Sequence, residues 1–236
     1  MRKNRNLMLL GCLWAGACLA PLAAQANPVV SMELTGVNES SLNGVNTGPY
    51  YATIGSNPAS VAVYCDDFLD DVNPGQVWQA TVTNMSELST TTLDTNLMFH
   101  DSTAAAQASN YMAAAWLAEQ IGSQNQSLPS GQLTAEQGSY ALWYIFDSSA
   151  LAGLSSSDYG AVLADYNAAF AAVVDDTPSD FSKVNIYTPL HSTPGSASSQ
   201  EYLAVDAPEP GTLALMAVGL AAIGWKARRR RQAQSI

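Results

Sequence analysis

Basic side chains are nearly absent from the middle of this chain. Only nine of the 236 residues are Lys or Arg, and Lys183 is the single one between Arg5 and Lys226. All twenty Asp and Glu lie between Glu33 and Glu209, so this stretch has a formal charge of −19, from one positive and twenty negative groups. Such a charge repels polyanions and anionic lipid, which excludes nucleic-acid binding. We expect a soluble, acidic surface that can attract divalent cations or cationic polymers.

Cysteine is also scarce. Cys12 and Cys18 lie in an N-terminal segment that we expect to be removed, which leaves Cys65 alone in the mature protein. A lone cysteine cannot form an internal disulfide. Its simplest interpretation is a small buried apolar residue on a strand. Intermolecular pairing, attachment chemistry and a bond to an atom other than sulfur stay open.

The usual catalytic and metal-binding motifs are missing. The two histidines, His100 and His191, lack metal-ligand spacing, and the chain has no glycine-rich phosphate loop, Gly-x-Ser-x-Gly or Ser-x-x-Lys motif. A Cys65–His nucleophile pair and a carboxylate pair for sugar hydrolysis stay open, because such partners meet in space. We predict no catalytic residue, no metal, no cofactor and a protein that is not an enzyme.

One dense group of acids lies in the first third of the chain. Its members are Asp66, Asp67, Asp70 and Asp71. They lack the alternating spacing and the glycine of an EF-hand loop. We therefore interpret them as part of a generic acidic surface.

The N-terminus has the three parts of a secretory signal peptide. Positive residues at 2, 3 and 5 precede an apolar run over 7–22, and Ala24-Gln25-Ala26 forms a small-x-small cleavage site. We predict that signal peptidase removes residues 1–26 and that the protein is exported.

The C-terminus has a second three-part segment. Pro208-Glu209-Pro210 precedes an apolar run over 211–225. A basic cluster follows: Lys226, Arg228, Arg229, Arg230 and Arg231. Fifteen helical residues span about 22 Å, somewhat less than a hydrocarbon core of about 30 Å, and the basic cluster holds the end of the chain in the cytoplasm. The run is thus either a simple anchor or a transmembrane stop that inserts transiently.

This tail, over about 207–231, resembles the PEP-CTERM sorting signal of Gram-negative bacteria that make extracellular polysaccharide. The resemblance implies recognition by an exosortase-type membrane protease and cleavage at or near Pro208-Glu209-Pro210. It also implies transfer from the inner membrane to the cell surface or extracellular matrix, where exopolysaccharide is the expected partner.

Between the two signals, residues 27–206 form one expected domain of the α+β class. We predict strands over 28–34, 50–54, 60–64 and 77–83, and returning strands over 186–187 and 201–205. Three helices are predicted over 105–121, 134–144 and 159–174. Thr134 and Gln137 form a capping box for the second, and Ser156 or Ser157 caps the third.

Parts of this domain resemble the thioester domains of bacterial surface adhesins. The resemblance covers about 48–147 and rests on the stretches 63–68, 114–117 and 140–146, which include Tyr64-Cys65-Asp66-Asp67 and Leu142-Trp143. In that family a Cys and a Gln form an internal thioester that captures amines. Cys65 matches the family Cys, and it is the residue that the resemblance marks as reactive.

The pattern departs from the family where the Gln is expected. That position holds Ser139, and Gln137 lies about 200° around the helix from it. We therefore predict a scaffold without the thioester, in a protein with a structural or adhesive role. Covalent adhesion through a Cys65 thioester is the first alternative, and an extracellular hydrolase is the second.

Overall fold

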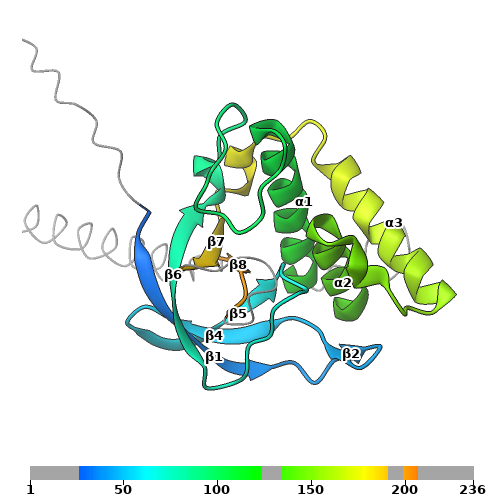
Figure 1. Cartoon of the computed structure of the whole chain (residues 1–236), viewed down its shortest axis with the longest axis horizontal. Coiled ribbons are helices and arrows are strands. Elements are labelled where there is room, and N and C mark those ends of the chain that lie inside the picture. Colours follow the sequence, from blue (N-terminus) through cyan, green and yellow to red (C-terminus); the bar gives the residue numbers. More distant parts are fainter. Residues whose placement is uncertain (1–26, 124–133, 191–198, 207–236) are drawn as a thin grey trace, which may run out of the picture.

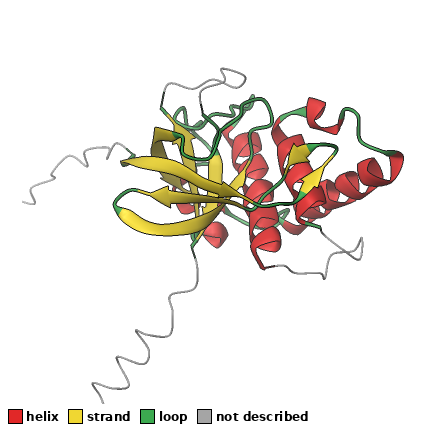
Figure 2. Ribbon diagram, turned by 90° about the horizontal axis from the view of Figure 1, so that it is seen from below, coloured by secondary structure: helices red, strands yellow, loops and turns green. Residues whose placement is uncertain are grey.

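The computed structural model describes residues 27–123, 134–190 and 199–206. These residues form an antiparallel β-barrel with a layer of helices on one side (Figure 1). Figure 2 shows the same separation from another direction, with the long strands of the barrel on one side and the long helices on the other. The predicted α+β class is confirmed, and the closure of the strands into a barrel is a feature that the sequence did not indicate.

The barrel has six strands, which are β1 (Val29–Val37), β4 (Tyr50–Ile54), β5 (Asn57–Cys65), β6 (Val77–Asn84), β7 (Val184–Pro189) and β8 (Tyr202–Val205). They follow the order β1-β4-β5-β8-β7-β6, and all neighbours are antiparallel. Met32 of β1 pairs with both Ile54 and Trp78, so β1 joins β4 to β6. Two short strands, β2 (Ser41–Leu42) and β3 (Val45–Asn46), form a separate ribbon.

Alternation along the strands produces two hydrophobic cores. Val63 and Cys65 belong to the core inside the barrel, whereas Tyr64 between them packs against the helices. The same alternation separates Tyr202 in the barrel from Leu203 on the helix side. Successive side chains of a strand point to opposite faces, and here each face is covered by one of the two cores. The side chains of β5 and β8 are therefore buried on both faces where the two strands pair.

The helical layer consists of α1 (Ala104–Ser123), α2 (Ala135–Phe146) and α3 (Ser156–Ala172), with short 3-10 turns at Met85–Glu87, Ser148–Leu151 and Pro178–Phe181. The alanine-rich α1 packs on α2, α3 and β8, because its small side chains allow close approach on several faces. Thr134 caps α2 as predicted, since its hydroxyl accepts a hydrogen bond from the Gln137 N–H (3.2 Å).

The predicted cap of α3 is wrong by one or two residues. Ser155 is the N-cap, and its hydroxyl accepts a hydrogen bond from the Asp158 N–H (3.2 Å). Ser155, Ser156 and Ser157 are consecutive, and only Ser155 has an acidic residue three positions later.

The predicted signal peptide, the sorting motif and the apolar run at 211–225 lie outside the described residues. Within the described ranges, no helix has the length and apolar character needed to span a membrane.

Candidate functional site

Cys65 ends β5 and lies inside the barrel with 2% of its surface exposed. Its thiol donates a hydrogen bond to the backbone carbonyl of Asp67 (3.1 Å). Burial raises the pKa of this thiol well above its usual range, and the neighbouring Asp67 and Asp66 raise it further. Because the thiolate is the nucleophilic form, the resting side chain is a protected, neutral thiol.

Ser139 is buried on α2, and its hydroxyl joins two parts of the backbone. It accepts a hydrogen bond from the Gly48 N–H (3.0 Å) and donates one to the Ala135 carbonyl (2.8 Å). The serine thus ties the loop before β4 to the first turn of α2. Gln137, the other residue considered for a thioester, is half-exposed at the start of the same helix.

The structure brings a different glutamine next to Cys65. Gln200 precedes β8, and its side-chain N–H donates hydrogen bonds to the carbonyls of Asp67 (3.1 Å) and Asp70, while its side-chain oxygen accepts one from the Tyr202 hydroxyl (2.8 Å). The Cys65 thiol and the Gln200 amide therefore bond to the same carbonyl oxygen. Sequence patterns could not identify Gln200, because its position depends on the pairing of β8 with β5.

The residues that follow Cys65 and Gln200 in the chain are Asp66 and Glu201, and they form a buried carboxyl pair. Asp66 and Glu201 both have 0% exposure, and the Asp66 N–H donates to the Glu201 carbonyl (3.4 Å). The Glu201 side chain accepts hydrogen bonds from the Tyr111 hydroxyl (2.5 Å), the Met98 N–H (2.9 Å) and the Thr188 hydroxyl. These donors come from α1, the segment before it, and β7.

The environments of these two acids differ. Burial raises the pKa of Asp66 well above its usual range, and the adjacent Glu201 raises it further. Burial also raises the pKa of Glu201, but the hydrogen bonds from Thr188, Tyr111 and Met98 oppose this effect because they favour its ionised form. Glu201 is therefore the more readily ionised of the two acids, and Asp66 holds its proton more tightly.

The interpretation of the aspartate group as acidic surface is wrong for three of its four members. Asp66, Asp67 and Asp70 are buried, and only Asp71 is exposed. Asp67 accepts a hydrogen bond from the Leu69 N–H (3.0 Å) and forms the tight turn that leaves β5. One backbone N–H of this turn thus stabilises Asp67, an acid that the charge pattern alone assigns to solvent.

The other sequence-based candidates lie apart from Cys65. His100 is exposed and lines a small hollow of about 160 Å³ beside Asn110 and Phe146, whereas Cys65 is enclosed in the barrel. His191 lies outside the described residues. Among the side chains that the structure describes, no three His, Cys, Asp or Glu are grouped as a metal ion would require.

The buried aspartates predict a pH-dependent stability. Burial raises the pKa of Asp67 from 3.8 to about 7. Between about pH 4 and 7 the folded state thus binds more protons than the unfolded state, so this group's contribution to the free energy of unfolding falls as pH rises, by at most about 1.4 kcal/mol per pH unit. Asp67→Asn keeps the acceptor for Leu69 and removes the titration, so we expect urea unfolding to show a flatter profile over this range.

The matched control is Asp175→Asn at an exposed position. It should leave the slope unchanged. Equal slopes in the Asp67→Asn and wild-type proteins would contradict the raised pKa.

Comparison with known proteins identifies the tail and gives one distant structural likeness. Residues 206–231 match the family described as the PEP-CTERM protein-sorting motif, which indicates an exported protein that an exosortase, a membrane protease, processes on the way to the cell surface. No curated protein sequence matches the chain.

Among solved structures, the chain is similar to the N-terminal thioester domain of fibronectin-binding protein SfbI from Streptococcus pyogenes. The two share 8% identity and a TM-score of 0.43, over 78% of this chain and 95% of that one. The neighbour is of the class that the sequence resembles, but a likeness this distant carries no argument about Cys65. The chain therefore carries a PEP-CTERM sorting motif that begins directly after β8.

Proposed function

We propose that this is a non-enzymatic surface or matrix protein that associates with exopolysaccharide in a structural or adhesive role after exosortase processing. The observation that carries the proposal is the position of the sorting motif. The matched residues begin at 206, directly after β8 (Tyr202–Val205), whose backbone is already paired with β7 and β5. Cleavage near Pro208-Glu209-Pro210 would therefore remove no described strand or helix.

The last contact of the described domain supports this interpretation. The Asp206 N–H donates a hydrogen bond to the Lys183 carbonyl (2.8 Å), so the paired backbone extends to the first residue of the motif. Cleavage after this point would therefore leave β7 and β8 paired in the released part of the protein. Its acidic surface keeps it soluble and is compatible with a neutral polysaccharide or a cationic polymer.

The first test is the intact mass of the protein recovered from its host. We expect a chain that begins at Asn27 and ends between Pro208 and Pro210. Replacement of the three residues Pro208-Glu209-Pro210 by alanine should leave the full tail in the membrane fraction. A native protein that retains Arg228 to Ile236 would contradict processing and leave a simple anchor.

A released domain that fails to sediment with the extracted polysaccharide would contradict the matrix role alone.

Covalent adhesion is a second candidate, which the shared contact of Cys65 and Gln200 favours. The Cys65 sulfur would attack the side-chain carbonyl carbon of Gln200, the C–N bond would break, and the amide nitrogen would leave as ammonia with the thiol proton. Since the thiol and the amide both bond to the Asp67 carbonyl, their separation is no longer than the two 3.1 Å bonds placed end to end. The buried, protonated thiol opposes the reaction.

Mass spectra before and after methylamine distinguish the two candidates. The non-covalent proposal predicts a chain of full mass that does not react. A Cys65–Gln200 thioester predicts a chain lighter by one ammonia that gains one methylamine, and both changes would disappear in Cys65→Ala and Gln200→Ala. Gln137→Ala is the matched control and should behave like the wild type in either case. A thioester lost in Gln137→Ala would contradict the assignment to Gln200.

A further inference from the structure

The barrel wall is incompletely paired between β5 and β8. These strands pair only at Tyr64 with Leu203 and at Cys65 with Tyr202. From Asn57 to Val63, β5 pairs with β4 along one edge, and no described strand pairs with its other edge. An unpaired strand edge presents backbone donors and acceptors that another extended chain can bind.

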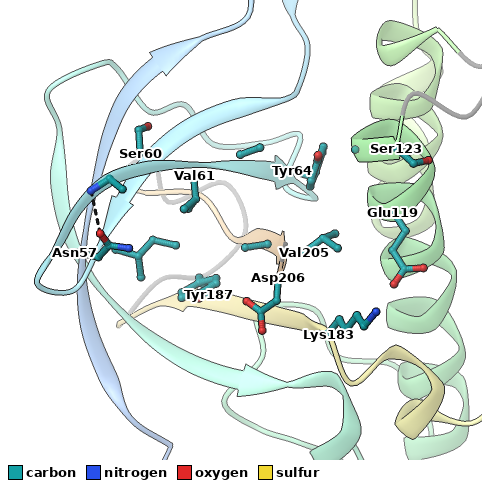
Figure 3. A pocket seen from close by; sticks show the side chains of 15 residues that line it. Asn57, Ser60, Val61, Tyr64, Glu119, Ser123, Lys183, Tyr187, Val205 and Asp206 are labelled. Carbon is teal, nitrogen blue, oxygen red and sulfur yellow. Dashed lines mark hydrogen bonds between the residues drawn. The ribbon is translucent and has the colours of Figure 1, made fainter. Parts of the chain in front are cut away.

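A cleft of about 970 Å³ lies along this unpaired edge (Figure 3). One wall is β5, the opposite wall is formed by β7 and β8, and the C-terminal end of α1 closes one end. Ala59, Ser60 and Ala62 line the β5 wall, and their short side chains leave the backbone accessible. The Ala59 N–H donates to the Asn57 side chain (3.0 Å), an acceptor from its own strand rather than from a neighbouring one.

The floor of the cleft is apolar. Val61 and Tyr187 point into the space between the strands, as Figure 3 shows, and both pack against the barrel core. At the end near α1, the Tyr64 hydroxyl lies so close to Gly122 that a Cβ on this glycine would be 2.5 Å from it. An incoming chain would therefore meet strand edges at the sides and apolar side chains beneath.

The charges at the end near α1 favour a basic group. Glu119 and Asp206 line this end together with Lys183, which is the only Lys or Arg in residues 27–206. Burial raises the pKa of Glu119, and the adjacent Lys183 opposes this rise. Two acids thus face one base, in a domain that is strongly acidic as a whole. A Lys or Arg brought beside Glu119 and Asp206 would balance the charge of the cleft.

We propose that this cleft binds an extended peptide segment bearing Lys or Arg, which adds as a strand to the free edge of β5. The segment would place its backbone along Asn57–Val63, its apolar side chains over Val61 and Tyr187, and a basic side chain near Glu119. This peptide-binding activity does not depend on exopolysaccharide association. A sugar fits the cleft less well, because Tyr64 and Tyr187 are only 4% and 8% exposed and offer no open ring for stacking.

The test uses the mature protein and a synthetic peptide of alternating threonine and valine with a lysine near each end. We expect binding by calorimetry and protection of β5 amides over Asn57–Val63 in hydrogen exchange. Methylation of every second peptide nitrogen removes the strand hydrogen bonds, so affinity should fall at least about tenfold. Glutamates in place of the lysines should weaken binding several-fold.

Variants of the protein locate the site. Ala59→Trp fills the cleft from an exposed position and should abolish binding, whereas Ala105→Trp, at an exposed position at the other end of α1, should not. Glu119→Gln should weaken binding about threefold, and Glu87→Gln, at an exposed position outside the cleft, should have no effect. Circular dichroism verifies that each variant is folded.

Several outcomes would overturn the proposal. Failure of the peptide to bind at millimolar concentration would do so, as would unchanged affinity of the methylated peptide. Full binding by folded Ala59→Trp would place the peptide elsewhere. Protection of the cleft by a neutral oligosaccharide, without protection by the peptide, would make the cleft a carbohydrate site. None of these results bears on whether the tail is processed.

Discussion

A single buried carboxylate, that of Glu201, connects the parts of this domain. It accepts hydrogen bonds from Tyr111 in α1, from Thr188 in β7 and from the Met98 N–H, and it lies beside Asp66 at the end of β5. Burying an ionised acid is unfavourable unless donors surround it. The helical layer and the two strands that complete the barrel must therefore be in place together for this group to be buried.

The same arrangement fixes the surroundings of Cys65. The residue before Glu201 is Gln200, whose amide bonds to the carbonyls of the turn after β5, and the residue after it is Tyr202, which pairs with Cys65. The segment that leads into β8 thus places the Gln200 amide on the same Asp67 carbonyl to which the Cys65 thiol donates. The short β8 also leaves the rest of the β5 edge unpaired, because its remaining residues pair with β7 and diverge from β5. One short strand accounts for both the enclosed thiol and the open cleft.

The sequence predicted local structure well and long-range contacts poorly. The strand at Val77–Asn84 and the cap at Thr134 follow from alternation and from side-chain chemistry over a few residues, and both were predictable. The pairing of β8 with β5 joins residues more than a hundred positions apart through two residue pairs, and no periodicity encodes it. For the same reason Gln200 was missed, and Asp66 was assigned to the surface although Tyr111 and Thr188 stabilise its buried partner.

The central claim is that the Glu201 carboxyl, surrounded by donors and beside a neighbour that holds its proton more tightly, joins the barrel to the helices. The most direct measurement is a titration of the side-chain carboxyl carbon shifts of Asp66 and Glu201 by carbon-13 NMR. We expect both carboxyls to titrate above the ordinary acid range, and Glu201 to lose its proton at a lower pH than Asp66. Two carboxyls that titrate in the ordinary acid range, or an Asp66 that loses its proton before Glu201, would contradict this claim.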